Sequence, residues 1–470
     1  MKDMLKKFNG SALIKSGIWY TAANFLLKGV NFFTIPIFTK MMSVDQYGTV
    51  DNFTSWVSIF TVIVGLNLSA AVNNATFEYK DDIKRFLSSV VFLGTLFFFM
   101  LLGISNLAYS YLGLFSNLNN WMLNFVIIQS YSQFIISFLS AYYIINSYYK
   151  RNIFLLFLST MLNIGISLLF MVTVYENKPA DGRIIGSTLG LLALALVILI
   201  KLLVEGKQLY NKEYWKFSLK IALPVIPHSL GNMLLSRFDR IIIKEFYGAY
   251  YVGLYGYIYN ISSIINVLWS SANNAWVPWF FNKMSEKKYT EIFKVSKLFT
   301  YFFTLMTIGV MTVTTDLARI MAPASYLEAI PLLIPISMSY YFMFLYGFPV
   351  NAEFYLKKTS IIGLGTVLSA GINIALNYLL IPRYGYMAAG ATNLVTYILL
   401  YVFHQIIVLK IFKEKIFPLK TFIQYSSILG VFGICLFLTL DNWLLKYAIM
   451  SIFCLGLLFK LYKEGKEYLA

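Results

Sequence analysis

The chain has 470 residues, of which 59% are hydrophobic and 13% are charged, and its mean hydropathy is +0.69. Soluble domains average roughly 25% charged residues, so this composition excludes an ordinary soluble protein and indicates a polytopic membrane protein. The formal net charge of +17 does not indicate nucleic-acid binding, because most Lys and Arg residues lie in short clusters between apolar runs. Basic clusters in that position mark topology and contact anionic lipid head groups.

The apolar runs predict fourteen membrane-spanning helices, since a crossing needs about 20 apolar residues. The first run follows Lys2, Lys6 and Lys7 and is too long for the core of a signal peptide. The predicted spans are 13–38, 52–74, 86–109, 121–147, 153–175, 184–203, 219–243, 252–280, 294–315, 329–350, 359–381, 386–408, 420–440 and 444–461.

Most Lys and Arg residues fall in alternate connections, which predicts that both termini are cytoplasmic. No predicted connection exceeds about 20 residues, so the large loop or soluble domain on which a membrane enzyme builds its catalysis is not expected. Cys435 and Cys454 match no metal or redox spacing. We therefore predict a protein that is not an enzyme and that uses no cofactor and no metal.

A faint internal repeat suggests two lobes. The turn Val44-Asp45-Gln46-Tyr47-Gly48 after the first span resembles Tyr250-Tyr251-Val252-Gly253-Leu254-Tyr255 after the seventh. Six helices per repeat is a common transporter arrangement. The predicted division is an N-terminal six-helix lobe at 1–217, a C-terminal six-helix lobe at 218–417 and two additional helices at 418–470.

The first span carries a lysine near its middle. Thr21, Asn24, Lys28 and Asn31 are spaced by three, four and three residues and so share one helix face. A cation at the bilayer centre costs roughly 2.5 to 3.5 kcal/mol, so Lys28 is expected to face a protected interior. The alternative is a lysine neutralised by burial or held by a carbonyl group.

The seventh span is the most highly charged. Arg237, Arg240 and Lys244 share one face, and His228, Asn232, Ser236 and Asp239 form an adjacent one. Pro224 and Pro227 allow this helix to bend. The alternative is a structural salt bridge in which Asp239 neutralises one neighbouring arginine.

Two further spans carry polar stripes, namely Asn260, Ser263, Asn266, Ser270 and Asn273 in one, and Thr366, Ser369, Asn373 and Asn377 in the other. Such stripes line an aqueous cavity or join helices to one another. Asp51 and Glu353 lie at predicted helix boundaries, where we expect them to be solvated, and His404 is expected to be structural.

Several segments resemble a known family. They are Leu223-Pro224-Val225-Ile226-Pro227, Arg237-Phe238-Asp239-Arg240, Gly253-Leu254-Tyr255, Ala322-Pro323-Ala324-Ser325-Tyr326 and Ile381-Pro382-Arg383-Tyr384-Gly385-Tyr386. In these segments and in its span count the chain resembles the bacterial O-antigen and capsule repeat-unit flippases of the multidrug/oligosaccharidyl-lipid/polysaccharide (MOP) exporter superfamily.

The resemblance implies an all-α, V-shaped arrangement of two six-helix lobes with a central cationic cavity, as in MATE transporters. It implies a flippase of the bacterial cytoplasmic (inner) membrane that moves an undecaprenyl-diphosphate-linked oligosaccharide to the outer leaflet by alternating access, for capsule, O-antigen or exopolysaccharide synthesis. The expected partners are this lipid-linked oligosaccharide, membrane lipids, a polymerase and other polysaccharide-assembly proteins.

On this interpretation Lys28, Arg237 and Arg240 bind the diphosphate, and the sugars meet polar cavity residues. Those residues are Asn24, Asn31, Asn232, Ser263, Asn266, Asn273, Asn373 and Asn377. The cycle is driven by the membrane potential or by ion coupling through Asp239 or His228. The alternatives are a cation-coupled multidrug exporter of the same superfamily and a flippase for a peptidoglycan or teichuronic-type precursor.

Overall fold

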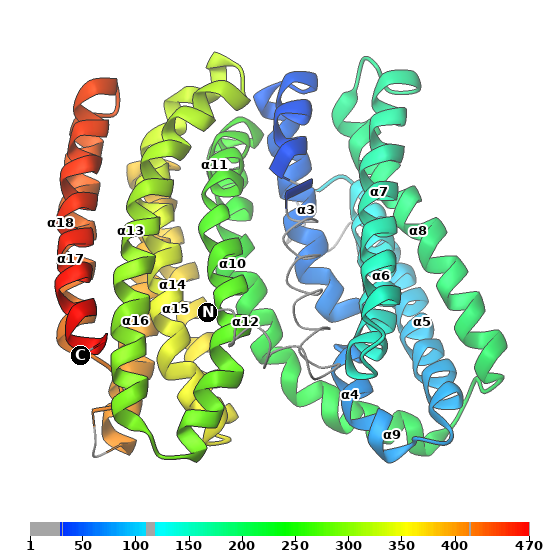
Figure 1. The fold of residues 1–470 in the computed structure, drawn as a ribbon. Coiled ribbons are helices and arrows are strands. Elements are labelled where there is room, and N and C mark those ends of the chain that lie inside the picture. Colours follow the sequence, from blue (N-terminus) through cyan, green and yellow to red (C-terminus); the bar gives the residue numbers. More distant parts are fainter. Residues whose placement is uncertain (1–28, 31, 110–117, 413–414, 470) are drawn as a thin grey trace. The chain divides into compact units, whose positions relative to one another are not determined.

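The computed structural model describes residues 29–30, 32–109, 118–412 and 415–469, which form helices joined by short connections (Figure 1). The described residues contain no β-strand, which confirms the predicted all-α membrane fold. The chain divides into two compact units. Unit 1 contains Met41–Val252, and unit 2 contains Phe32–Lys40 together with the residues from Gly253 onward.

Unit 1 is a bundle of helices that follow one another along the chain. They are α3 (Val44–Val64), α4 (Ser69–Glu78), α5 (Ile83–Ala108), α6 (Asn120–Ile145), α7 (Tyr149–Thr173), α8 (Pro179–Gly206), α9 (Lys212–Ala222), the 3₁₀ helix η3 (Leu223–Val225) and α10 (Ile226–Tyr247). The chain leaves this unit in the first turn of α11 (Ala249–Ser262).

Unit 2 contains most of α11 and the remaining elements. They are α12 (Ile264–Ser285), α13 (Tyr289–Met321), the 3₁₀ helix η4 (Ala324–Leu332), α14 (Leu333–Tyr355), α15 (Thr359–Tyr384), α16 (Ala388–Ile411), α17 (Leu419–Leu438) and α18 (Trp443–Leu469). The helical segment Phe32–Met41 also belongs largely here, and the Thr39 hydroxyl donates to the Met321 carbonyl at 2.9 Å.

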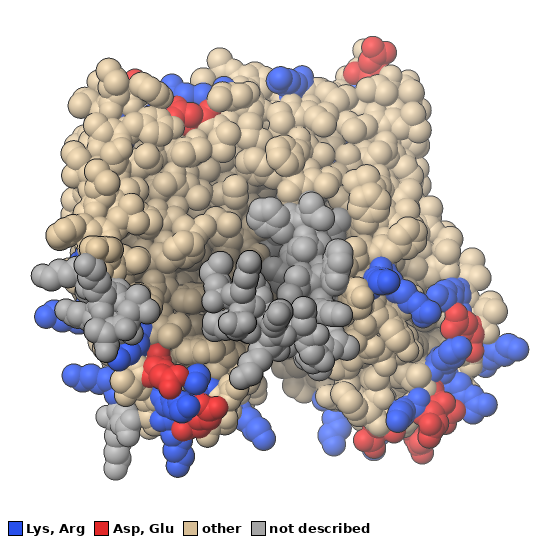
Figure 2. Space-filling model, in the orientation of Figure 1, with Lys and Arg blue, Asp and Glu red and all other residues tan. Residues whose placement is uncertain are grey.

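Eleven helical stretches of the described residues are long and apolar enough to cross a membrane, and they fall on eleven of the fourteen predicted spans. Of the other three, 13–38 lies mostly outside the described residues. The span predicted at 219–243 is the strongly charged α10, and the span predicted at 252–280 is divided between α11 and α12. Figure 2 shows charged side chains gathered at one end of each unit, as expected where a membrane protein meets water.

The second predicted span is two helices rather than one. Ser43 and Gln46 form a capping box that starts α3 at Val44, earlier than predicted. Leu66 and Asn67 then have φ angles of +46° and +51°, a left-handed conformation that ends α3 before α4 begins. The early start places Asp51 in the second turn of α3 rather than at its first residue.

Glycines let α8 approach the backbone of α7 closely. Gly182, Gly186 and Gly190 lie four residues apart and so share one face of α8. A Cβ atom at Gly186 would lie 2.6 Å from the Ser167 Cα atom, and one at Gly190 would lie 2.6 Å from the Leu162 carbonyl oxygen. The two helices can therefore pack in this way only with glycine at these positions.

A short amphipathic helix, α9, occupies part of the predicted connection between the sixth and seventh spans. The Asn211 side chain caps it by accepting hydrogen bonds from two backbone N–H groups. Tyr214 and Phe217 pack on the rings of Tyr79 and Phe86, with centroids 4.8 to 6.0 Å apart. Aromatic packing therefore fixes α9 against α4 and α5 before the chain enters α10.

In unit 2, buried hydroxyl groups of α13 bond within their own helix. Thr300, Thr304, Thr307 and Thr312 each donate to the carbonyl oxygen four residues earlier, at 2.7 to 2.9 Å. These contacts satisfy the hydroxyl donors within α13 itself, and the Thr304 hydroxyl also lies 3.0 Å from that of Tyr341 on α14.

The helix α18 is joined to α13 by a buried lysine. Lys446 Nζ lies 2.5 Å from Asp316 Oδ1 and 3.0 Å from Thr315 Oγ1, and the Tyr447 hydroxyl donates to Asp316 Oδ2 at 2.8 Å. Lys446 lies within the last predicted span, and its side chain is only 2% exposed. This ion pair therefore ties the last helix, α18, to α13.

Candidate functional site

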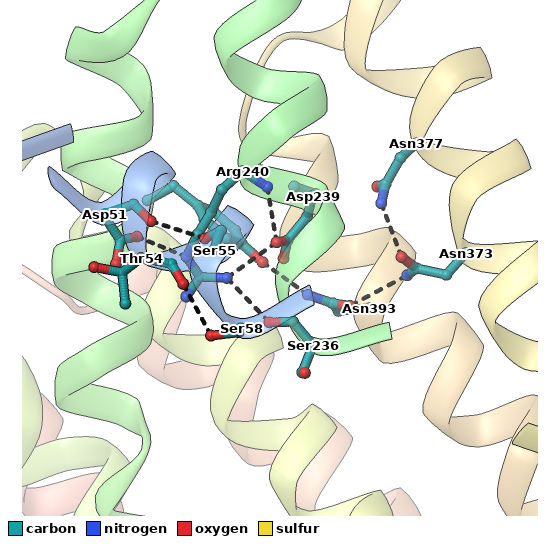
Figure 3. Close-up of polar contacts among 12 residues, drawn as sticks. Asp51, Thr54, Ser55, Ser58, Ser236, Asp239, Arg240, Asn373, Asn377 and Asn393 are labelled. Atoms are coloured by element: carbon teal, nitrogen blue, oxygen red, sulfur yellow. Dashed lines mark hydrogen bonds and ion pairs between the residues drawn. The ribbon is translucent and has the colours of Figure 1, made fainter. Parts of the chain in front are cut away.

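Arg240 on α10 forms a buried cluster with two carboxylates (Figure 3). Its Nε atom donates to Asp51 Oδ2 on α3 at 2.6 Å, and its Nη1 atom donates to Asp239 Oδ1 at 3.0 Å. The Arg240 side chain is 0% exposed and that of Asp51 is 8% exposed. The expectation that Asp51 is solvated is therefore wrong, because α10 covers it.

The charges of this cluster show what it does within unit 1. Two carboxylates and one guanidinium carry a formal charge of minus one, and the N–H groups of Arg240 form charge-assisted hydrogen bonds, which are roughly twice as strong as neutral ones. Arg240 Nη1 also donates to the Ser236 carbonyl at 3.1 Å. These contacts fix the C-terminal half of α10 to α3 within unit 1.

Arg237 has a different environment from Arg240. It lies one turn earlier on α10, its side chain is half-buried, and within the described residues it forms no ion pair. Lys244, one turn beyond Arg240, is also half-buried. Of the two arginines predicted to bind an anion, Arg237 is thus the one whose charge no described carboxylate compensates.

The other polar side chains of α10 follow a line along the helix. The Asn232 amide donates to His228 Nε2 at 3.2 Å, and the Ser236 hydroxyl donates to the Asn232 carbonyl at 2.8 Å. Asn232 is exposed and His228 is half-buried. Asp239 turns away from this line toward Arg240, so the predicted polar face of α10 consists of His228, Asn232 and Ser236.

Asn373 and Asn377 lie in a buried amide network in unit 2, part of which Figure 3 shows. Asn377 Nδ2 donates to Asn373 Oδ1 at 3.0 Å, and Asn373 Nδ2 donates to Asn393 Oδ1 at 3.2 Å. Asn393 in turn donates to the Tyr255 hydroxyl at 2.7 Å. The network connects α15, α16 and α11, which matches the interhelical role that the sequence left open for this stripe.

The remaining predicted cavity residues have separate surroundings. Asn273 Oδ1 accepts a hydrogen bond from Asn351 at 3.0 Å, and the Ser263 hydroxyl donates to the Asn260 carbonyl at 2.6 Å. Asn266 is half-buried. Lys28, Asn24 and Asn31, which were predicted to share a face of the first span, lie outside the described residues.

Glu353 and His404 form a contact that the sequence did not predict. Glu353 Oε2 on α14 lies 2.7 Å from His404 Nδ1 on α16, and both side chains are 0% exposed. The expectation that Glu353 is solvated is therefore wrong, although its predicted place near the end of a helix is correct. In the described part of the chain, no group of three or more His, Cys, Asp or Glu side chains is arranged to hold a metal ion.

The fold is similar to solved transporter structures. The lipid II flippase MurJ in an inward closed conformation superimposes with a TM-score of 0.73 and 17% identity, covering 95% of this chain and 99% of that one. An inward-facing MATE-family multidrug resistance transporter of the MOP superfamily gives a TM-score of 0.59 and 13% identity, covering 82% and 98%. The chain is thus a multi-pass membrane protein with the fold of MOP transporters.

The sequence comparison defines the family. The model described as polysaccharide biosynthesis protein matches residues 13–284, which is more than half of the chain, and the chain belongs to this family. An uncharacterized membrane protein of Haemophilus influenzae is 24% identical over 287 residues, or 58% of this chain and 67% of that protein. The Lsg locus putative protein 1 of the same organism is 22% identical over 288 residues, or 59% and 68%.

Proposed function

We propose that this protein is a flippase that moves an undecaprenyl-diphosphate-linked oligosaccharide from the cytoplasmic to the outer leaflet of a bacterial cytoplasmic membrane by alternating access. The observation that carries the proposal is Arg237, a half-buried cation on α10 that forms no ion pair within the described residues. An intramembrane cation marks a functional site unless it is neutralised. In a protein of the polysaccharide-biosynthesis family, a lipid-linked diphosphate is an anion that suits it.

The two arginines of α10 have different roles in this proposal. Arg240 is a positioning residue, because its contacts with Asp51 and Asp239 hold α10 on α3. Arg237 then presents its planar guanidinium to the diphosphate, which it can contact through two parallel N–H groups. Lys28 is the second proposed diphosphate contact. The sugars meet exposed or half-buried polar groups such as Asn232 and Asn266.

The direction of transport follows from charge. The lysine-rich connections favour a cytoplasmic position for both termini. With the inside negative, outward movement of an anion gains about 2.3 kcal/mol per charge per 100 mV. The product would serve capsule, O-antigen or exopolysaccharide synthesis, and a polymerase would use it at the outer leaflet.

The test compares Arg237→Ala and Arg237→Lys with the wild type in cells whose surface polysaccharide depends on this chain. We expect Arg237→Ala to reduce surface polysaccharide at least tenfold, because one charged hydrogen-bonded contact contributes on the order of 1.4 kcal/mol or more. Arg237→Lys should retain part of the surface polysaccharide, because lysine keeps the positive charge. Arg383→Ala is the matched control, because Arg383 is exposed at the end of α15 and its loss should have no effect.

Drug sensitivity separates this proposal from multidrug export. The α10 cluster contains the carboxylates of Asp51 and Asp239, and carboxylates are a feature that would suit a cationic drug. If Arg237→Ala leaves surface polysaccharide unchanged and instead alters sensitivity to cationic drugs, the flippase proposal is wrong and the exporter is correct.

A further inference from the structure

The contact between Glu353 and His404 leaves two polar atoms without a partner. Within the described residues, Glu353 Oε1 and His404 Nε2 are buried and form no hydrogen bond. Buried polar atoms are nearly always hydrogen-bonded in native proteins, so each exception calls for an explanation. Here one of the two atoms is a ring nitrogen, which carries either a lone pair or a proton, on the side of the imidazole opposite Glu353.

The surroundings of the pair keep it apart from other charges. The Tyr346 ring, the titratable neighbour on α14, packs at 5.1 Å from the imidazole centroid. No charged residue occurs in α15 between Thr359 and Ile381. Lys357 and Lys358, which follow α14, and Lys410 near the end of α16 are exposed to solvent. No ion pair other than the contact with His404 is formed by Glu353 in the described chain.

Gly365 on α15 packs against the unpartnered ring nitrogen. A Cβ atom at this position would lie 2.4 Å from His404 Nε2, closer than two such atoms can approach. Glycine at position 365 therefore allows the imidazole to occupy its position between α14, α15 and α16.

The protonation states of the pair differ in net charge. With Nε2 unprotonated, the neutral imidazole donates its Nδ1–H to the carboxylate, and the pair carries one negative charge in a buried site. A proton on Nε2 converts the imidazole to imidazolium, and the pair becomes neutral overall. Glu353 Oε1 and His404 Nε2 are the two atoms of the pair that form no hydrogen bond within the described residues, so the geometry leaves a position for one further proton on the pair.

We propose that Glu353 and His404 form a proton-binding site in unit 2, and that this proton is the coupling ion of the transport cycle. The second clause rests on the flippase function proposed above, whereas the first does not. Glu353 lies in the last turn of α14, next to Lys357 and Lys358, so the site exchanges its proton with the side of the membrane that carries the lysine-rich connections.

The proton can be observed directly, because the chain contains only two histidines. In a His228→Gln background, ¹⁵N-labelled histidine reports on His404 alone in the full-length protein in lipid nanodiscs. We expect its ring resonances to change from neutral imidazole to imidazolium between about pH 9 and pH 5. Glu353→Gln should lower the proton affinity by about tenfold or more. A resonance that stays constant over this range, or that is unaffected by Glu353→Gln, overturns the proton site.

Coupling is tested by flipping of undecaprenyl-diphosphate-linked N-acetylglucosamine in proteoliposomes with an imposed pH gradient. The wild-type rate should depend on the gradient, and the rates of Glu353→Gln and His404→Gln should not. Asp316→Asn is the control, because it weakens another ion pair of unit 2 and should keep the gradient dependence. A gradient-independent wild type overturns the coupling. A wild type that flips none of this lipid contradicts the proposed function, while the NMR titration still tests the proton site.

Discussion

Arg240 and Asp51 are 189 residues apart in the sequence, yet the Nε atom of one lies 2.6 Å from Oδ2 of the other. We expect Arg240→Met to destabilise the protein by about 3 to 5 kcal/mol, because it leaves two buried carboxylates without their cation. Asp51→Asn should cost less, about 1.5 to 3 kcal/mol, since an amide oxygen still accepts from Nε and Asp239 still compensates the arginine. Denaturant unfolding in detergent micelles measures both.

The control for these two variants is Lys84→Gln. Lys84 pairs with Glu205 at 3.5 Å on the exposed surface, and such a pair contributes at most about 1 kcal/mol. If Asp51→Asn proves as destabilising as Arg240→Met, then Arg240 does not hold the two carboxylates in the way described.

The close packing of the glycine face of α8 on α7 predicts that the effect of a Gly→Ala substitution on protein stability depends on its position. Gly186→Ala would place a Cβ atom 2.6 Å from the Ser167 Cα atom, so the backbones of α7 and α8 must separate, at a cost of about 1 to 3 kcal/mol. Gly165→Ala on α7 meets nothing within 4 Å and should be neutral or stabilising by up to about 1 kcal/mol. Thermal unfolding of the two variants provides the comparison, and equal stabilities would contradict the close packing of these helices.

The amide network of unit 2 should contribute to stability rather than to cargo binding. Asn373→Leu removes the hydrogen bonds to Asn393 and Asn377, and we expect a loss of about 0.6 to 1.7 kcal/mol, the range for hydrogen bonds between membrane helices. Asn266→Leu is the matched variant, because Asn266 is half-buried and forms no hydrogen bond of this kind with any residue that the structure describes. It should reduce surface polysaccharide with little effect on unfolding. If Asn373→Leu instead reduced surface polysaccharide and Asn266→Leu instead lowered stability, the sugar-binding face would lie on α15.

Lys446 is expected to hold α18 in place. Lys446→Met removes the contacts with Asp316 and Thr315, so backbone hydrogen–deuterium exchange should increase in α18, while α14 stays protected. Arg319→Gln is the control, because its pair with Asp441 is largely exposed and contributes little. Unchanged exchange in α18 of Lys446→Met would show that apolar packing alone is sufficient to hold this helix.

Hydropathy predicted the membrane-spanning helices because each one is a local run of apolar residues. Basic residues close in sequence mark the ends of these runs. It did not predict the burial of Asp51 and Glu353. Their positions near predicted helix ends suggested contact with water, and the residues that cover them lie on helices distant in sequence. Burial of a single charge is decided by such distant partners, which one sequence does not reveal.

The helix α9 was missed for a different reason. Asn211 is a favourable capping residue, and Tyr214, Phe217 and Ser218 recur at helical spacing, so its signal was present in the sequence. The glycine spacing of 182, 186 and 190 was likewise visible, and it is typical of close helix packing in membranes.

The threonines of α13 have a consequence for motion within unit 2. Their hydroxyl groups already donate to carbonyl oxygens of the same helix, and the Thr304 hydroxyl also lies 3.0 Å from that of Tyr341 on α14. Shear between α13 and α14 would break that bond and leave the intrahelical ones intact. A transporter has to change shape repeatedly. Because these hydroxyl groups are hydrogen-bonded within α13, the polar interface between α13 and α14 can shear at low enthalpic cost.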